Sequence, residues 1–280
     1  MILSTTPATL APGGGTLLVL VTVVLYLLAT VPAQPLRRFS AAALVGGWLL
    51  HGLLLLIDIA GIGLPEPGAR LGFAPVLSMT VWLVIAVYSI ESRLVPLPAV
   101  RQWLALAGLV AMLVVAAYPG ELRPITSQLA PLHFTLGVAA YALFGAAVLH
   151  GLMLDAAERR MRGGPQGAPR ALPAVGRALG MPLLQLERLT FRFVEVGFAV
   201  LTATLLLGIA TTVQWRWTDH KAVFSLMAWA VFAALLIGRR LRGWRGRKAT
   251  RWLYVGALLL LLAYVGSRFV LEVLLGRSPA

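Results

Sequence analysis

Eight separate apolar stretches, each at least 17 residues long, constrain the fold of this 280-residue chain more than any other feature. A helix of that length crosses a hydrocarbon core of about 30 Å. In lipid only helices and closed barrels satisfy their own backbone hydrogen bonds, and none of the stretches alternates as a barrel strand does. The stretches lie near residues 15–32, 40–60, 72–90, 97–117, 133–154, 194–213, 222–238 and 252–272. The sequence therefore predicts an all-α polytopic membrane bundle of about eight transmembrane helices, forming one integral membrane domain over residues 1–280.

The charged residues predict the orientation of this bundle. Seven Arg lie between Asp155 and Arg192, and seven Arg or Lys lie from Arg239 to Arg251, whereas the 61–71 and 118–131 connections hold one Arg each. By the positive-inside rule the Arg-rich connections are cytoplasmic, so both termini are expected outside and residues 155–192 form a cytoplasmic loop. This arrangement puts 18 of the 24 basic residues inside. The net charge of +14 is thus explained by topology and contact with the lipid bilayer, and no nucleic-acid partner is expected.

Several classes of chemistry are excluded by residues that the chain lacks. It has no cysteine, which removes disulfides, thiolate metal sites and covalent haem attachment. It also lacks the GxxxxGK[ST], GxSxG and HExxH patterns, so we expect no catalytic residues and no enzyme. A metal or haem would have to be held by His, Met or oxygen.

Four histidines are the remaining candidates for such chemistry. His133 opens the fifth apolar stretch at its outer end, and His150 follows 17 residues later, roughly 26 Å along a helix, so the two cannot share a small ligand. We expect His150 to extend into the inner interface. His51 lies in the middle of the second stretch with Asp58 on the same helix face, where it either serves a function or bonds across helices. His220 lies in the outer loop that contains Trp215 and Trp217.

The loop from Trp215 to Lys221 and its flanking residues carry the most specific pattern. The segment runs through Leu186-Glu187-Arg188-Leu189-Thr190-Phe191-Arg192, Gly197-Phe198, Leu201-Thr202 and Gly208 into Trp215-x-Trp217-x-Asp219-His220-Lys221-x-x-Phe224-Ser225-Leu226-x-x-Trp229. Upstream stands His133-Phe134, followed by Ala140-Tyr141-Ala142. Tryptophan is common at any membrane interface, so the loop tryptophans alone favour an interfacial belt over a binding site.

Taken together, these segments resemble the cytochrome c assembly membrane proteins of the CcsA, CcmC and HemX type. That family has an external WWD segment that typically ends in WxWDPKExWS and lies against haem, and a helix start HVxxxxxSYA whose His is a haem ligand. The sequence is more similar to the YpjD-like, eight-span bacterial branch, through Asp219-x-Lys221-Ala222-Val223-x-Ser225, Gly243-Trp244-Arg245-Gly246-Arg247 and Gly266-Ser267-Arg268. The resemblance covers residues 125–275 by motif and the first four stretches by hydropathy.

The resemblance implies a multi-pass, haem-handling protein of the bacterial cytoplasmic (inner) membrane, related to cytochrome c assembly. It implies non-covalent haem as cofactor, and haem or other cytochrome assembly or membrane proteins as partners. Haem needs an axial nitrogen, a flat apolar surface and cations for its propionates. The implied metal ligands are His133 and His51, and the other implied cofactor-binding residues are Trp215, Trp217, Asp219, His220, Lys221 and Arg268.

The chain also departs from the family pattern. Thr218 is inserted before Asp219, His220 stands where the motif has Pro, and no His follows the last apolar stretch, where the family has a second external ligand. Two other functions therefore stay open. One is transport of a small solute, suggested by His51 and Asp58 within the bilayer. The other is a haem-free scaffold or regulator of membrane-protein assembly.

The predicted topology can be tested with single cysteines, because the chain has none of its own. Cysteines at Gly120 and Thr218 should react with a membrane-impermeant maleimide in intact cells. Cysteines at Gly164 and Gly246 should react only after permeabilisation. A cytoplasmic residue 218 would rule out a haem site on the outer face.

Overall fold

The computed structural model describes residues 14–31, 39–59, 69–91, 98–123, 129–163, 183–211, 220–270 and 273. Contacts within the chain group into two compact units. Unit 1 comprises Met1–Ser78 and Arg101–Thr126, and unit 2 comprises Met79–Val100 and Ser127–Ala280. Each unit is described by itself below.

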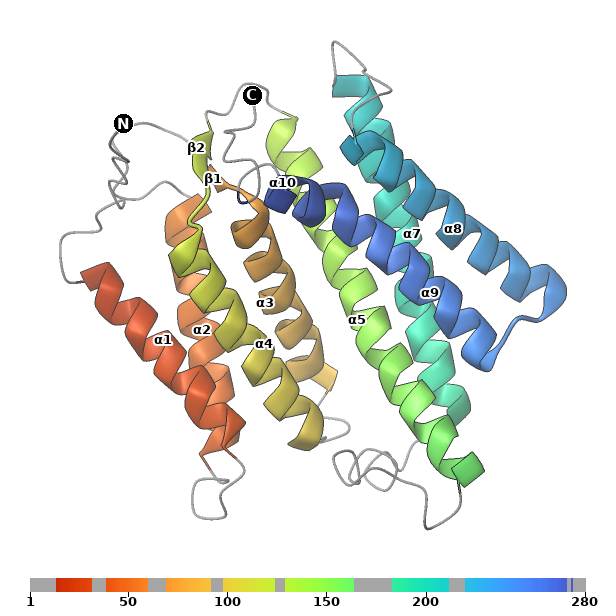
Figure 1. The fold of residues 1–280 in the computed structure, drawn as a ribbon, viewed down its shortest axis with the longest axis horizontal. Helices are drawn as coiled ribbons and strands as arrows, with labels where there is room; N and C mark the ends of the chain where they lie inside the picture. The colour runs from red at the N-terminus through yellow and green to blue at the C-terminus, as the bar shows by residue number, and fades with distance from the viewer. Residues whose placement is uncertain are drawn as a thin grey trace. The chain divides into compact units, whose positions relative to one another are not determined.

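Unit 1 is built from apolar helices and a pair of short strands. It contains α1 (Gly14–Thr30), α2 (Ser40–Ile59), the start of α3 (Phe73–Glu91) and most of α4 (Pro98–Ala117), shown in red to yellow in Figure 1. Two short strands, β1 (Ala69–Leu71) and β2 (Glu121–Arg123), pair antiparallel. This pairing holds the connections that follow α2 and α4 together, as expected if both lie on the same side of the membrane.

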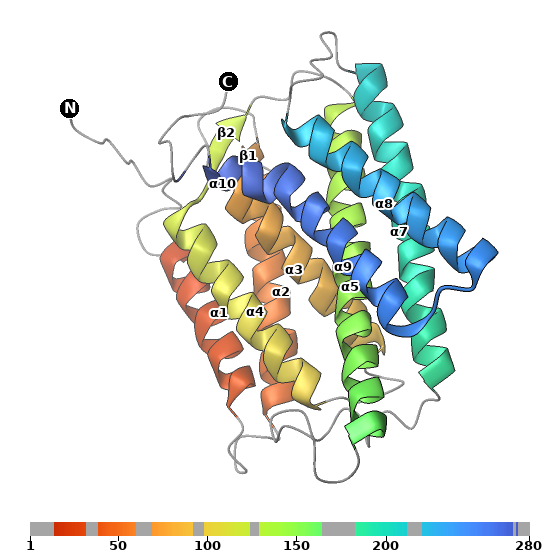
Figure 2. The same ribbon diagram turned by 45° about the vertical axis from the view of Figure 1, so that its right-hand side comes forward.

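Unit 2 contains the rest of α3 and the elements that carry most of the motif residues. These elements are α5 (Ala130–Gly163), α7 (Leu183–Thr211), α8 (His220–Arg242), α9 (Gly246–Leu261), the π-helical turn η2 (Leu262–Gly266) and α10 (Ser267–Phe269). Figures 1 and 2 both show α7 beside α5, with α9 crossing α5. Their core is apolar, and the rings of Phe144 and Phe232 stack at its centre with centroids 3.8 Å apart.

All eight predicted stretches fall in helices, which confirms a helical membrane bundle. Within the described residues, six helices are long and apolar enough to cross a membrane, and two apolar helices, Gly15–Thr30 and Phe73–Ser89, are shorter. The loop predicted over residues 155–192 is shorter than expected, because α5 continues to Gly163 and α7 begins at Leu183. The single integral domain predicted from the sequence stays a prediction.

A buried carboxylate in the part of α5 expected to be cytoplasmic contacts α9. Asp155 is only 9% exposed, and it accepts hydrogen bonds from Thr250 Oγ1 at 2.8 Å and Tyr254 OH at 2.9 Å, both on α9. A buried charge is tolerated when it is hydrogen-bonded in this way. These bonds join the end of α5 to the beginning of α9.

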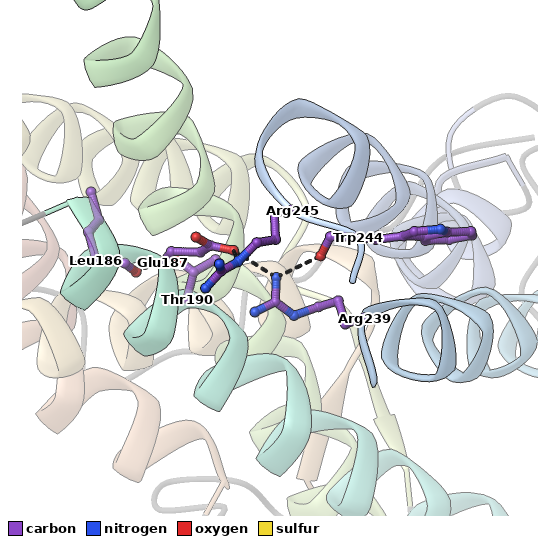
Figure 3. A network of polar contacts seen from close by, with 6 residues as sticks. All are labelled: Leu186, Glu187, Thr190, Arg239, Trp244 and Arg245. Atoms are coloured by element: carbon purple, nitrogen blue, oxygen red, sulfur yellow. Dashed lines mark hydrogen bonds and ion pairs between the residues drawn. The ribbon is translucent and has the colours of Figure 1, made fainter. Parts of the chain in front are cut away.

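The turn between α8 and α9 is held by a second polar network, shown in Figure 3. Arg239 donates to Glu187 Oε1 at 3.0 Å and to the Trp244 carbonyl at 3.3 Å, and its guanidinium lies 3.4 Å from the centre of the Phe191 ring. Arg245 also contacts Glu187 Oε1, at 3.5 Å. Glu187 thus joins the start of α7 to both ends of the turn.

This network predicts unequal effects of removing its members. Glu187→Gln leaves the largely buried Arg239 without its carboxylate and should lower the free energy of unfolding by about 1–3 kcal/mol. Arg245→Ala removes a side chain that is 65% exposed and should cost less than about 1 kcal/mol. The measurement is thermal or denaturant unfolding in detergent, with Arg192→Ala in the exposed Arg192–Glu195 pair as control. Equal losses in all three variants would contradict this assignment.

Candidate functional site

His133 lies in the first turn of α5 and packs against α7. Its backbone N–H donates to the Leu129 carbonyl at 3.0 Å, which fixes the residue at the start of the helix. The imidazole lies over Gly208, where an added Cβ would be 3.0 Å from Cε1. The ring is half-buried, and its buried Nδ1 has no hydrogen-bond partner within the described part of the chain. A buried nitrogen in this state is able to accept a bond from a bound group.

The helix face below His133 is closely packed on α7 and α9. Gly137 and Tyr141 follow His133 at intervals of four residues and therefore share its face of α5. A Cβ at Gly137 would lie 3.8 Å from Thr204 Cγ2 on α7, and the Tyr141 hydroxyl donates to the Leu260 carbonyl on α9. The position of His133 is thus fixed by two neighbouring helices.

The motif residues on α7 and α8 also meet. Trp229 Nε1 donates to Thr202 Oγ1 at 2.9 Å, and the Trp229 ring stacks on Phe198 with centroids 5.5 Å apart. His220 is exposed and Lys221 is half-buried, and both lie in the first turn of α8. Trp215, Trp217, Asp219 and the side chain of Arg268 lie outside the described residues.

His51 belongs to unit 1 and is fully buried there. Its Nδ1 is 3.0 Å from the Tyr26 hydroxyl on α1, and its Nε2 is 2.6 Å from Ser78 Oγ on α3. Both ring nitrogens are therefore engaged, and ligation of a metal by His51 would require one of these bonds to be given up. The geometry favours hydrogen bonding across helices, the structural alternative raised by the sequence.

Comparison with known families identifies the family of this chain. The family model for the cytochrome C assembly protein matches residues 14–275. This chain belongs to the cytochrome c assembly protein family. The resemblance inferred from the motifs is thereby confirmed, and the match includes both the His133 helix and the first four apolar helices.

Individual members of the cytochrome c assembly family show more limited similarity. The Inner membrane protein YpjD of Escherichia coli (strain K12) is 31% identical over 144 residues, which are 51% of this chain and 52% of the relative. The Cytochrome c biogenesis protein CcsA of Synechococcus sp. (strain CC9902) is 34% identical over 87 residues, 29% of this chain and 28% of the relative. The aligned part of the chain thus spans about half the length of YpjD and less of CcsA. No solved structure matches the chain.

The structure of this family member corrects one sequence prediction. His150 does not extend into the membrane interface, since it is only 5% exposed. Its Nδ1 donates to the Ala146 carbonyl at 2.7 Å, and its ring lies 5.3 Å from that of Phe193 on α7. The helical carbonyl one turn earlier is a nearer partner than water, so the ring stays in the helix interface.

The residues that surround the candidates were missed by sequence reasoning. Tyr26 and Ser78 bond to His51, and Thr250 and Tyr254 bond to Asp155. Each of these four residues lies many positions along the chain from the residue to which it bonds. The available signal was weak. An isolated hydroxyl or carboxylate within an apolar stretch needs a partner on another helix, but the sequence does not say which one.

The structural role of His51 predicts stability effects without effects on cofactor content. Tyr26→Phe removes one hydrogen bond to His51 and should cost about 0.5–2 kcal/mol, the range for a bond between membrane helices. His51→Ala should cost more, because it also leaves a cavity and frees the Ser78 hydroxyl. Melting temperature and haem content in detergent check this together. Loss of haem in His51→Ala at unchanged melting temperature would show that His51 is a ligand.

Proposed function

We propose that this protein binds or presents haem at the outer face of the bacterial inner membrane, through His133, as a non-enzymatic component of cytochrome assembly. The observation that carries the proposal is the buried, unpartnered Nδ1 of His133 beside Gly208. Nδ1 of His133 has no hydrogen-bond partner among the described residues, whereas Nδ1 of His150 already donates to the Ala146 carbonyl.

The residues present fit the needs of haem. An axial ligand must offer a nitrogen lone pair from a ring held in place, and His133 has this on a helix packed against α7. The propionates require cations, for which Lys221 and Arg268 are the candidates. Trp215 and Trp217 would supply the flat surface, with Asp219 and His220 beside them.

Membership of the cytochrome c assembly family supports this proposal, as do the names of two relatives. CcsA is named a cytochrome c biogenesis protein, and YpjD is named an inner membrane protein. The outer face follows from the distribution of basic residues. YpjD and CcsA are matched over 52% and 28% of their own length, so their functions come to this chain only through the proposal.

In this function the protein's own residues would bind and orient haem, and they would keep water away from it. When bound, haem would supply its iron, and His133 would be the residue that holds it. Gly208 leaves room for the imidazole, because any larger residue would meet Cε1. The packing of Gly137 and Tyr141 on α7 and α9 keeps the ring from turning away. The loop tryptophans would shield the macrocycle from water.

The two alternative functions rest on different residues. A solute transporter was suggested by His51 and Asp58, but His51 has both nitrogens engaged by neighbouring helices. A haem-free scaffold was suggested by the missing second external His. With one axial His, we expect weaker or more transient haem binding than a pair of ligands would give, and His220 is the candidate for a second.

Removing the His133 imidazole tests the proposal. His133→Ala should lose most of the bound haem, at least tenfold in occupancy, because no described nitrogen replaces Nδ1 on that face. The measurement is the Soret absorbance per protein after purification from haem-replete cells. The control is His150→Gln, which keeps a side-chain donor for the Ala146 carbonyl and should retain haem. Equal loss in both variants would indicate misfolding and would contradict ligation by His133.

The contact with Gly208 gives an independent test. Gly208→Ala places a Cβ at 3.0 Å from His133 Cε1, so the ring must move and haem binding should fall several-fold. Gly137→Ala on the facing helix adds a Cβ at an ordinary 3.8 Å from Thr204 and should have little effect. Haem titration of both detergent-purified variants, with their melting temperatures, makes the comparison. Unchanged affinity in Gly208→Ala would show that the ring is not held at this position for haem.

A further inference from the structure

The last transmembrane helix contains a turn that is wider than an α-helix. α9 ends at Leu261, η2 occupies Leu262–Gly266, and α10 resumes at Ser267. A π-turn accommodates about one extra residue, and such turns occur frequently at functional sites. Ser267–Phe269 are therefore rotated by about 100° relative to an unbroken α-helix, in which each residue advances by that angle. The turn sets which face of the helix these residues occupy.

Hydroxyl groups of two residues bind the carbonyls around this wide turn. The Tyr141 hydroxyl on α5 donates to the Leu260 carbonyl just before it. Ser267 Oγ, just after it, bonds to the carbonyls of Ala263 at 2.9 Å and Tyr264 at 3.1 Å. Leu260 and Ala263 are only 3% and 2% exposed, so water does not hydrogen-bond to their carbonyls. The Ser267 bonds are of a kind also made within regular helices of this chain, for example by Thr190 and Thr202, so they do not select the wide turn. The Tyr141 hydroxyl comes from another helix, and it stabilises the carbonyl at the start of the turn in an apolar interior.

We propose that Tyr141 is a positioning residue, whose hydroxyl holds the π-turn open and so fixes the rotation of Ser267–Phe269 relative to His133. Tyr141 and His133 lie on the same face of α5, eight residues apart. The hydrogen bond to Leu260 thus couples the His133 helix to the helix that carries residue 268. For haem binding this consequence rests on the proposed function, in which Arg268 is a propionate partner.

The absence of cysteine makes the rotation measurable. Single cysteines at positions 268 to 270 are compared for maleimide labelling rate in the full-length protein, where Phe269 and Val270 are the exposed reference positions. If Tyr141→Phe allows the turn to become α-helical, each residue takes the environment of the residue after it. The labelling pattern should then move one position toward the N-terminus.

A rescue and a matched control complete the experiment. Deleting Val265 from the turn in the Tyr141→Phe background removes the extra residue and should restore the original pattern. Tyr254→Phe also removes a tyrosine hydroxyl that joins α9 to α5, through Asp155, but it is away from the turn and should leave the pattern unchanged. An unshifted pattern in folded Tyr141→Phe, or the same shift in Tyr254→Phe, overturns the proposal.

The haem readout separates this inference from the proposed function. The labelling experiment needs no haem, so a shifted and rescued pattern supports the role of Tyr141 even if no Soret band is found. If haem is bound, Tyr141→Phe should weaken it several-fold, and the Val265 deletion should recover affinity in the same background. Recovery of the labelling pattern without recovery of affinity would contradict the part played by Arg268.

Discussion

In a protein whose solvent is largely lipid, each buried polar group must find its partner within the chain, and the structure is organised around these pairs. His51 is held by Tyr26 and Ser78, Asp155 by Thr250 and Tyr254, and Glu187 by Arg239 and Arg245. Each set links neighbouring helices and helps to fix their position relative to one another. By contrast, the buried Nδ1 of His133, which lies beside Gly208, has no hydrogen-bond partner among the described residues.

The sequence predicts the helices well, because the length of an apolar stretch is set by the thickness of the membrane. It also predicts the family, since His133, Gly208 and Trp229 belong to segments with specific spacing. It does not predict that Asp155 is buried, because its partners Thr250 and Tyr254, which donate hydrogen bonds to it, lie about 100 positions later in the chain. The π-turn cannot be predicted for the same reason, since the Tyr141 hydroxyl that donates to the Leu260 carbonyl lies 119 residues away from it along the chain.

The candidate site is predicted in part. The family resemblance and the expected membrane depth single out His133 from the sequence, and the structure adds its contact with Gly208. Of the other candidates, His51 is hydrogen-bonded to neighbouring helices. No periodicity in the sequence distinguishes such a histidine from one that binds a metal. The loop tryptophans lie outside the described residues and stay predictions from the motif.

The visible absorption spectrum of the full-length protein, purified in mild detergent and titrated with haem, tests the central claim most directly. The account predicts a Soret band that saturates at one haem per chain, with a red shift relative to free haem in the same detergent, as expected when a histidine nitrogen enters the axial position. A spectrum that stays equal to that of free haem throughout the titration, in protein that remains folded, would contradict the claim that this chain handles haem.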